Sequence, residues 1–141
     1  MALDSIFGIA GTALNAQLTR MNATASNLAN AGTVSATEKE AFRAKRPVFQ
    51  ALMDEQMTHS GAAYVGGVKV AKIADDTAPP QRVADPKNPL ADKDGYVYKS
   101  NVSEVTEMVE MMAAARSYQN NVEVINTARQ LMMRTLDITK A

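Results

Sequence analysis

Residues 6–33 form one stretch of helical pattern that contains a single charged residue, Arg20. Apolar or small residues recur along it in alternating steps of four and three residues: Phe7, Gly11, Leu14, Leu18, Met21, Ala25 and Leu28. This mean step, about 3.5 residues, keeps one seam of a helix against a partner helix in a left-handed supercoil. The other face carries uncharged polar residues where a solvated helix carries Lys and Glu: Asn15, Thr19, Asn22, Ser26 and Asn30. A helix that is polar without being charged is typical of one with protein on several sides.

The ends of this helix can be placed from capping signals. Asp4 or Ser5 can serve as the N-cap, and Gly32 can end the helix in the left-handed conformation that glycine readily adopts. The pattern therefore predicts one helix of roughly 26 residues, about 40 Å long.

A second helical pattern begins at Asn101, where Glu104 completes a capping box, and runs almost to the C-terminus. Its apolar line also averages about 3.4 residues a step: Val105, Met108, Met112, Ala115, Tyr118, Val122, Ile125, Ala128, Met132 and Leu136. Acids crowd its start and bases its later half, which is the order that the helix dipole favours. The two seams predict that the terminal helices pair as an antiparallel coiled-coil-like hairpin.

Residues 34–100 differ in composition, because they hold all five prolines and four of the seven glycines. Turn signals there bound short β-branched and aromatic runs, which predict strands at 64–65, 68–73 and 96–98. Segments 34–41 and 54–63 are expected to be loops. We therefore predict a mainly α fold with a small β part, divided into an N-terminal helix (1–33), a central loop and strand segment (34–100) and a C-terminal helix (101–141).

Composition excludes several classes of function. Lys plus Arg and Asp plus Glu each number 15, so the formal charge is zero, whereas nucleic-acid binding requires a positive surplus. The absence of cysteine excludes disulfides and thiolate metal sites. The N-terminal residues lack the basic start of a secretory signal, and no apolar run approaches the length of a transmembrane helix, so neither is expected.

Catalytic and metal-binding patterns are weak. His59 is the only histidine, so a metal site lacks a second nitrogen ligand, and a triad on Ser26 or Ser60 would need this same residue as its base. A solvated loop histidine is the favoured interpretation. The segment 92–95 (DKDG) is similar to the middle of a calcium loop, but Leu90 and Asn101 occupy ligand positions at its two ends, which favours a tight turn. We expect no enzyme activity, cofactor or metal.

Three methionines cluster near the start of the second helix, at Met108, Met111 and Met112. They predict a contact surface, which is either packed core, the commoner arrangement, or an adaptable groove for a partner helix.

Several motifs resemble the bacterial flagellar rod and hook family. Residues 25–31 (ASNLANA), followed by 42–45 (FRAK), resemble the family's N-terminal signature. Residues 85–92 (DPKNPLAD), 95–97 (GYV), 107–109 (EMV), 115–119 (ARSYQ) with Asn121, and 66–70 (GGVKV) are similar to its proximal rod members. The resemblance spans essentially the whole chain in the expected order.

This resemblance implies a structural subunit of the proximal rod of the flagellar basal body, the drive shaft that carries motor torque. It implies helical assembly in which the terminal helices form an inner tube, and export without a cleaved signal through the flagellar type III apparatus. The implied partners are other copies of the chain, the rod proteins FlgB, FlgF and FlgG, and the adaptor FliE, with neither nucleic acid nor a small-molecule substrate.

The residues expected to pack or to assemble lie on both helices: Leu14, Leu18, Met21, Asn22, Ala25, Asn27, Leu28, Asn30, Val105, Met108, Met112, Tyr118, Asn121, Val122, Ile125, Met132 and Leu136. Asn27 and Asn30 are expected to cap backbone groups or to bond neighbours, and the alternative is that they only end the helix. A different class of function stays open, a soluble coiled-coil adaptor or chaperone that forms a closed oligomer. An interfacial membrane helix at 6–28 is disfavoured by its single basic residue.

Overall fold

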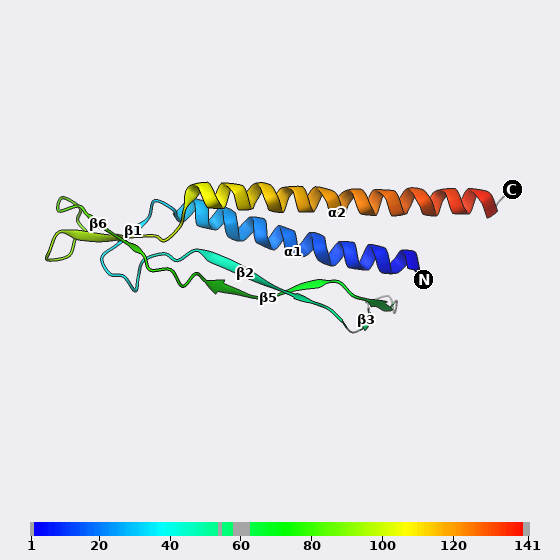
Figure 1. Ribbon diagram of the computed structural model, residues 1–141, viewed down its shortest axis with the longest axis horizontal. Coiled ribbons are helices and arrows are strands. Elements are labelled where there is room, and N and C mark those ends of the chain that lie inside the picture. The colour runs from blue at the N-terminus through cyan, green and yellow to red at the C-terminus, as the bar shows by residue number, and fades with distance from the viewer. Residues whose placement is uncertain (1, 54, 58–62, 140–141) are drawn as a thin grey trace. The chain divides into compact units, whose positions relative to one another are not determined.

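The computed structural model describes residues 2–53, 55–57 and 63–139. Along the chain, the long helix α1 (Ala2–Asn30) precedes a central segment of short strands, and the long helix α2 (Glu104–Thr139) follows it (Figure 1). The strands are β1 (Val34–Ser35), β2 (Lys45–Ala51), β3 (Glu55–Met57), β4 (Ala63–Val65), β5 (Val68–Asp75), β6 (Gln81–Ala84) and β7 (Tyr96–Lys99). The prediction of a mainly α chain with a small β part is confirmed. His59 and Ser60, considered above as catalytic candidates, lie outside the described residues.

Helix α1 differs from its predicted bounds at both ends. It begins at Ala2, so neither Asp4 nor Ser5 is its N-cap, because Ala and Leu at the start favour helix and extend it. Gly32 follows the helix but does not take the predicted left-handed conformation. The chain instead leaves the helix through tight turns, in which the backbone N–H and the hydroxyl of Thr33 both donate to the Asn30 carbonyl.

Helix α2 begins three residues later than the predicted cap at Asn101. Ser103 is the capping residue, since its carbonyl accepts from the N–H of Glu107 at 2.9 Å and its hydroxyl accepts from the N–H of Thr106. The Asn101 side chain binds the central segment instead. It accepts from the N–H of Ala44 at 2.8 Å and donates to the Ala78 carbonyl at 2.7 Å. The predicted capping box was therefore wrong, because a tertiary contact uses the amide.

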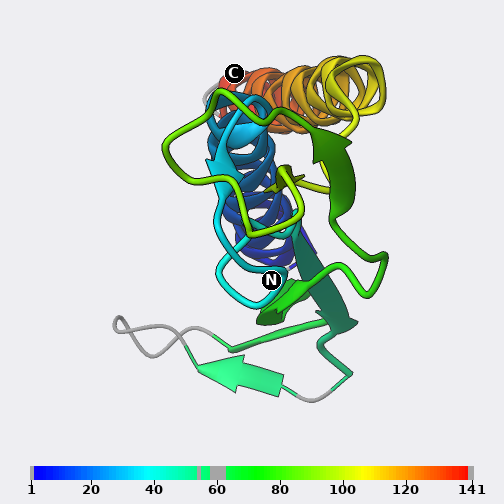
Figure 2. The ribbon, with the colours of Figure 1, turned by 90° about the vertical axis from the view of Figure 1, so that its left-hand side faces the viewer.

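The strands form three small sheets. A three-stranded sheet has the order β1-β7-β6, with Val34 opposite Lys99 and Val83 opposite Val97, and its central residue Val97 is buried. Strand β2 pairs with β5, and β3 pairs with β4 (Figure 2). The pairs β1–β7, β6–β7 and β3–β4 are antiparallel.

The predicted strands at 64–65, 68–73 and 96–98 are confirmed as β4, β5 and β7. The predicted loops 34–41 and 54–63 are partly wrong, because they contain β1 and β3. Strands β2 and β6 were missed. Strand β2 carries Lys45, Arg46 and Pro47 in its first half, a composition that gives no alternation of apolar and polar residues.

The turn before β7 follows its predicted form. The Asp92 carboxylate accepts from the N–H groups of Asp94 and Tyr96, each at 2.9 Å, and Gly95 has a φ of 81°. Through these bonds to the backbone, the Asp92 carboxylate stabilises a turn and is not arranged as part of a calcium loop.

The chain divides into two compact units. One comprises Met1–Thr19, Val48–Lys72 and Ala113–Ala141, and the other comprises Arg20–Pro47 and Ile73–Met112. The core of the second unit is built from small residues, Ala31, Ala44 and Val102, with Phe42 packed against them. Of the helices in the part of the chain that the structure describes, none is long and apolar enough to span a membrane.

Candidate functional site

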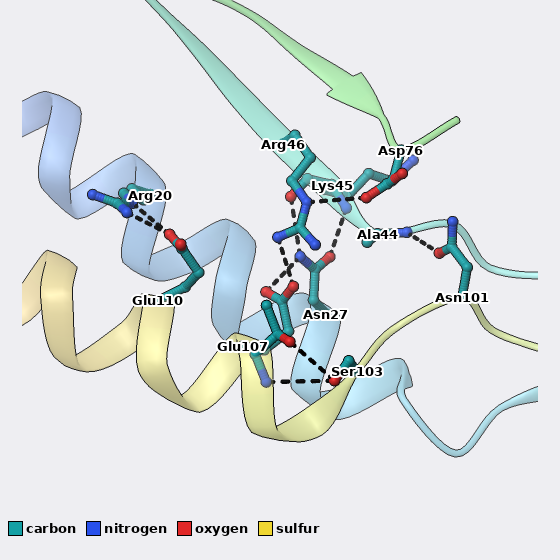
Figure 3. A network of polar contacts seen from close by, with 11 residues as sticks. Arg20, Asn27, Ala44, Lys45, Arg46, Asp76, Asn101, Ser103, Glu107 and Glu110 are labelled. Atoms are coloured by element: carbon teal, nitrogen blue, oxygen red, sulfur yellow. Dashed lines mark hydrogen bonds and ion pairs between the residues drawn. The ribbon is translucent and has the colours of Figure 1, made fainter. Parts of the chain in front are cut away.

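The second unit encloses a buried carboxylate on the first turns of α2. Glu107 is fully buried, and its Oε1 lies 2.6 Å from Nη1 of Arg46 on β2 in an ion pair (Figure 3). Its Oε2 accepts from Nδ2 of Asn27 on α1 at 2.9 Å. A charge that is removed from water is costly unless it is paired, so these two contacts are what make the burial tolerable.

Asn27 joins α1 to the start of β2. Its Nδ2 also donates to the Lys45 carbonyl at 3.0 Å, and its Oδ1 accepts from the Lys45 N–H at 2.7 Å. The side-chain amide thus pairs with a backbone N–H and C=O as a neighbouring strand would. Since Asn27 is fully buried, this pairing satisfies groups that have no access to water.

Arg46 also binds Asp76, the residue that follows β5. Its Nε donates to Oδ2 of Asp76 at 3.3 Å, while Asp76 Oδ1 accepts from the N–H of Ala78 at 3.0 Å. The Ala78 hydrogen bond and then Arg46 lower the pKa of Asp76 below its usual value, against the opposing effect of burial. Partial burial opposes the charge of Arg46, but its bonds to Glu107 and Asp76 outweigh it and raise the arginine pKa. We call Asn27, Arg46, Asp76 and Glu107 the Glu107 cluster.

A second ion pair joins the two helices one turn further along α2. Arg20 on α1 donates through Nε to Oε2 of Glu110 at 3.1 Å, and its Nη2 pairs with the same oxygen. In the second unit, therefore, the acids Glu107 and Glu110 are both neutralised by arginines of other elements. The contacts pair Asn27 with Glu107 and Arg20 with Glu110, so the two helices run antiparallel within this unit.

In the first unit, a turn that contains Gly67 binds α1. Thr12 accepts the N–H of Val68 at 3.1 Å through its hydroxyl, which donates to the Ile9 carbonyl at 2.7 Å. Gly67 has a φ of 120°, and a Cβ at this position would lie 2.8 Å from the Thr12 Oγ1. Only glycine fits this turn without strain, because both the conformation and the space exclude a side chain.

The chemistry of these sites is structural. The carboxylate of Glu107 is fully buried and is bound by an arginine and an amide, so it is not presented to a substrate from solvent. Among the described residues, no group of three or more His, Cys, Asp and Glu side chains is arranged to hold a metal ion. The Glu107 cluster can fix the register of α1, α2 and β2 against one another, which is the best-attested use of buried polar groups.

The predicted seam of α1 has the right period but a different phase. Leu18 is 47% exposed and Ala25 is also exposed, whereas Leu14, Met21 and Leu28 are half-buried. The buried or half-buried line runs one residue earlier, again in alternating steps of three and four: Ala10, Ala13, Gln17, Arg20, Thr24, Asn27 and Ala31. The inward face of the helix is thus turned by about 100° from the predicted seam.

Part of the predicted α2 seam lies on the inward face of the helix and part lies outside it. The buried or half-buried line is Glu107, Met111, Ala114, Tyr118, Asn121, Ile125, Ala128 and Met132. The predicted residues from Tyr118 to Met132, including Val122, therefore lie on or beside it. Val105, Met108 and Met112 are more than half exposed and Leu136 is half exposed, so the predicted seam does not turn these four residues inward in the single chain, and their expected part in assembly stays a prediction.

The asparagine side chains that were expected to pack or to assemble differ in what they bind. Asn27 bonds backbone and side-chain groups of other elements, whereas the Asn30 side chain donates to the Ser26 carbonyl in its own helix at 2.8 Å. Asn22 is exposed, and Asn121 donates to the Ser117 carbonyl of its own helix. The sequence patterns predicted neither a role for Arg46 nor the burial of Glu107. A signal for Arg46 was the basic run 43–46 in a chain whose formal charge is zero.

Comparisons with known proteins find family matches in both terminal parts of the chain. Residues 7–37 match the family model described as "Flagella basal body rod protein" and residues 93–138 match "Flagellar basal body rod FlgEFG protein C-terminal". The two matches cover most of α1 and α2, including Asn27 and Glu107.

Full-length relatives give the same result. The chain is 49% identical over 138 residues to the flagellar basal-body rod protein FlgC of Escherichia coli O6:H1, with 98% of each chain covered. It is 48% identical to that of Salmonella typhimurium, also over 98% of each chain. It is 36% identical to that of Bacillus subtilis, over 94% of this chain and 95% of the relative.

These matches define a class of structural protein, the axial subunits of the flagellar basal-body rod. Within that class, the chain belongs to the FlgC family. It is a structural subunit of the rod and belongs to no enzyme family.

Proposed function

We propose that the chain assembles helically into the proximal rod, with α1 and α2 paired as an antiparallel coiled-coil-like hairpin in an inner tube and the central segment outside. In this position the subunit transmits motor torque through the rod. The proposed neighbours are other copies of the chain, FlgB, FlgF and FlgG, and the adaptor FliE. Export through the flagellar type III apparatus without signal cleavage belongs to the same proposal.

One observation carries this proposal, namely that both helices present an uncharged or apolar face to solvent in addition to their inward faces. On α2 of the second unit, Val105 is 74% exposed and Met112 is 64% exposed. On α2 of the first unit, Leu131, Met133 and Ile138 are each more than half exposed. Exposed apolar surface of this extent is typical of a subunit whose neighbours cover it.

The first unit has a cavity that a neighbouring subunit could fill. A shallow cavity of about 360 Å³ lies between Ile6 of α1 and the α2 residues Val124, Thr127 and Leu131, and its lining is mostly apolar. A neighbouring subunit that inserts an apolar side chain there would remove this lining from water, which is favourable.

The experiment replaces Leu18 by Glu in a motile strain of a bacterium that carries this gene. We expect loss of swimming and absence of the variant from isolated basal bodies, because assembly would bury an unpaired carboxylate. Since Leu18 is half exposed in the single chain, the purified variant is expected to fold normally, as judged by circular dichroism. Leu18→Met, which keeps the side chain apolar, serves as the matched control and is expected to swim.

Normal swimming and normal rod content of the Leu18→Glu strain would contradict the proposal. A purified chain that forms a closed dimer or tetramer of fixed mass, and that does not enter rods, would favour the adaptor or chaperone alternative.

A further inference from the structure

The structure separates the three methionines near the start of α2. Met108 and Met112 are 54% and 64% exposed, whereas Met111 is half-buried. Met108 and Met112 are four residues apart, so they lie one turn apart on the same side of the helix. Met111 lies on the inward line with the fully buried residues Glu107 and Ala114. The second unit therefore presents two neighbouring thioether side chains to solvent, and we call Met108 and Met112 the methionine pair.

The surroundings of the methionine pair on α2 are apolar and uncharged. Val105 and Val109 lie on the same side of the helix and are 74% and 54% exposed. The acids of these turns, Glu107 and Glu110, are paired with arginines of β2 and α1. Oxidation of a methionine replaces an apolar thioether by a polar sulfoxide. At the methionine pair this change would place two polar groups in the middle of an apolar surface.

The contacts that join the elements of the second unit lie on the opposite side of α2. Glu107 is bound there by Arg46 and Asn27. At about 100° per residue, the methionine pair projects roughly 100–140° away from Glu107. Sulfoxides at the methionine pair therefore extend into water and leave these contacts in place. A sulfoxide at Met111 would instead put a polar group on the inward face.

We infer that the methionine pair is a site of reversible oxidation in the unassembled chain, with hydrogen peroxide or another small peroxide as the oxidant. The thioether sulfur attacks one oxygen of the peroxide, so that an S–O bond forms as the O–O bond breaks. After proton transfer, the second oxygen of hydrogen peroxide leaves as water. Each sulfur loses two electrons, the peroxide gains them, and the product is methionine sulfoxide. Methionine sulfoxide reductases return the sulfoxide to the thioether.

The consequence for assembly rests on the proposed function. If neighbouring subunits cover the apolar surface of α2, two sulfoxides there lose water when the subunit assembles, and burying a polar group without a hydrogen-bond partner is costly. Oxidation thus withholds a folded subunit from rods, and reduction makes it competent again.

The first test is chemical and does not depend on the proposed function. The purified full chain is treated with hydrogen peroxide without denaturant, quenched at intervals, digested and mapped by mass spectrometry, in which each sulfoxide adds about 16 Da. We expect Met108 and Met112 to be oxidised several times faster than Met111. Met53, which is 81% exposed, is the internal standard for a freely accessible methionine.

Circular dichroism is recorded on the same samples. We expect the helical signal to be unchanged when the methionine pair is fully oxidised. Oxidation of Met111 as fast as the pair, or loss of helix when only the pair is oxidised, would overturn the inference and leave the proposed function standing.

The second test measures assembly. A strain without its own copy of the gene is induced to make the wild-type chain or the Met108→Leu, Met112→Leu variant, with and without sublethal hydrogen peroxide. We expect both chains to restore swimming without peroxide, and the leucine variant to restore it in a larger fraction of cells with peroxide. Met53→Leu, which removes an exposed methionine outside the pair, is the matched control and is expected to behave as the wild-type chain. Equal peroxide sensitivity of all three chains would overturn the inference.

A polar variant decides the case in which the leucine variant does not swim. Met108→Gln, Met112→Gln carries a polar group of similar size in place of each sulfoxide. We expect the purified variant to have the wild-type helical signal and to be absent from isolated basal bodies. Normal swimming of this variant would overturn the inference, whereas the proposed function stands or falls with Leu18→Glu.

Discussion

The first turns of α2 have two sides with opposite chemistry. The side turned into the protein carries Glu107, which is fully buried and bound by Arg46 and Asn27, whereas the outward side carries Val105, Met108, Val109 and Met112. An isolated globular protein usually has the reverse arrangement, with charge outside and apolar side chains inside. The difference fits our proposal that other subunits cover the apolar surface, while the buried polar cluster joins α1, β2 and α2 within the single chain.

The largest expected effect on stability comes from the inward side. Glu107→Ala leaves the Arg46 guanidinium and the Asn27 amide without their acceptor. We expect the free energy of unfolding to fall by about 2–4 kcal/mol, less than for a fully enclosed pair because the Arg46 side chain is 38% exposed. Urea unfolding measures the change. Glu104→Ala on the exposed side is the control, and a loss as small as that of the control would mean that the cluster does not fix the fold.

Asn27→Ala is expected to lower the free energy of unfolding by about 2 kcal/mol, because the Lys45 N–H and C=O lose their bonds to the amide and the buried Glu107 loses its amide donor. Asn22→Ala, five residues earlier on the exposed side, is expected to change it by less than about 0.5 kcal/mol. Thermal unfolding of the two variants side by side gives the comparison. Equal losses would contradict the assignment of inward and outward faces.

Gly67→Ala extends the comparison to the first unit, where a turn rather than a salt bridge binds α1. We expect a loss of about 1–3 kcal/mol, since the new Cβ meets the Thr12 hydroxyl and the backbone conformation excludes side chains. Gly11→Ala is the matched control, because a Cβ at this exposed helical position meets nothing within 4 Å. It is expected to raise stability by about 0.5–1 kcal/mol. The sign of each change, measured by chemical denaturation, tests the turn.

The smallest effect on stability is expected for the outward side. Met108→Glu should change the free energy of unfolding by less than about 0.5 kcal/mol, because the side chain is already in water. Swimming is nevertheless expected to be lost, since assembly would bury the new charge. Met108→Leu is expected to retain swimming. A Met108→Glu chain that unfolds at much lower urea concentration would show that Met108 stabilises the single chain.

Much of the fold could be predicted from local signals. The two long helices follow from uninterrupted 3.5-residue patterns, and β4, β5 and β7 follow from aromatic and β-branched runs between turns. Strand β2 could not be predicted, because Lys45 and Arg46 look solvated until their partners on β5 and α2 are known. The cap at Ser103 was missed for the same reason. Asn101 has the stronger local capping signal, but its side chain binds the backbone of Ala44 and Ala78 in the central segment.

The sequence alone determined the period of each helix, the uncharged polar face of α1 and the absence of cysteine, since these can be read from the residues themselves. It could not determine which face turns inward, because each helix carries two lines with nearly the same spacing, and the inward line includes a charged residue, Arg20 on α1 and Glu107 on α2. Only the tertiary structure decided this, by pairing Glu107 with Arg46, Asn27 with Lys45 and Arg20 with Glu110. A buried charge or amide is stable only where its partner is, and those partners lie on elements far away in the sequence.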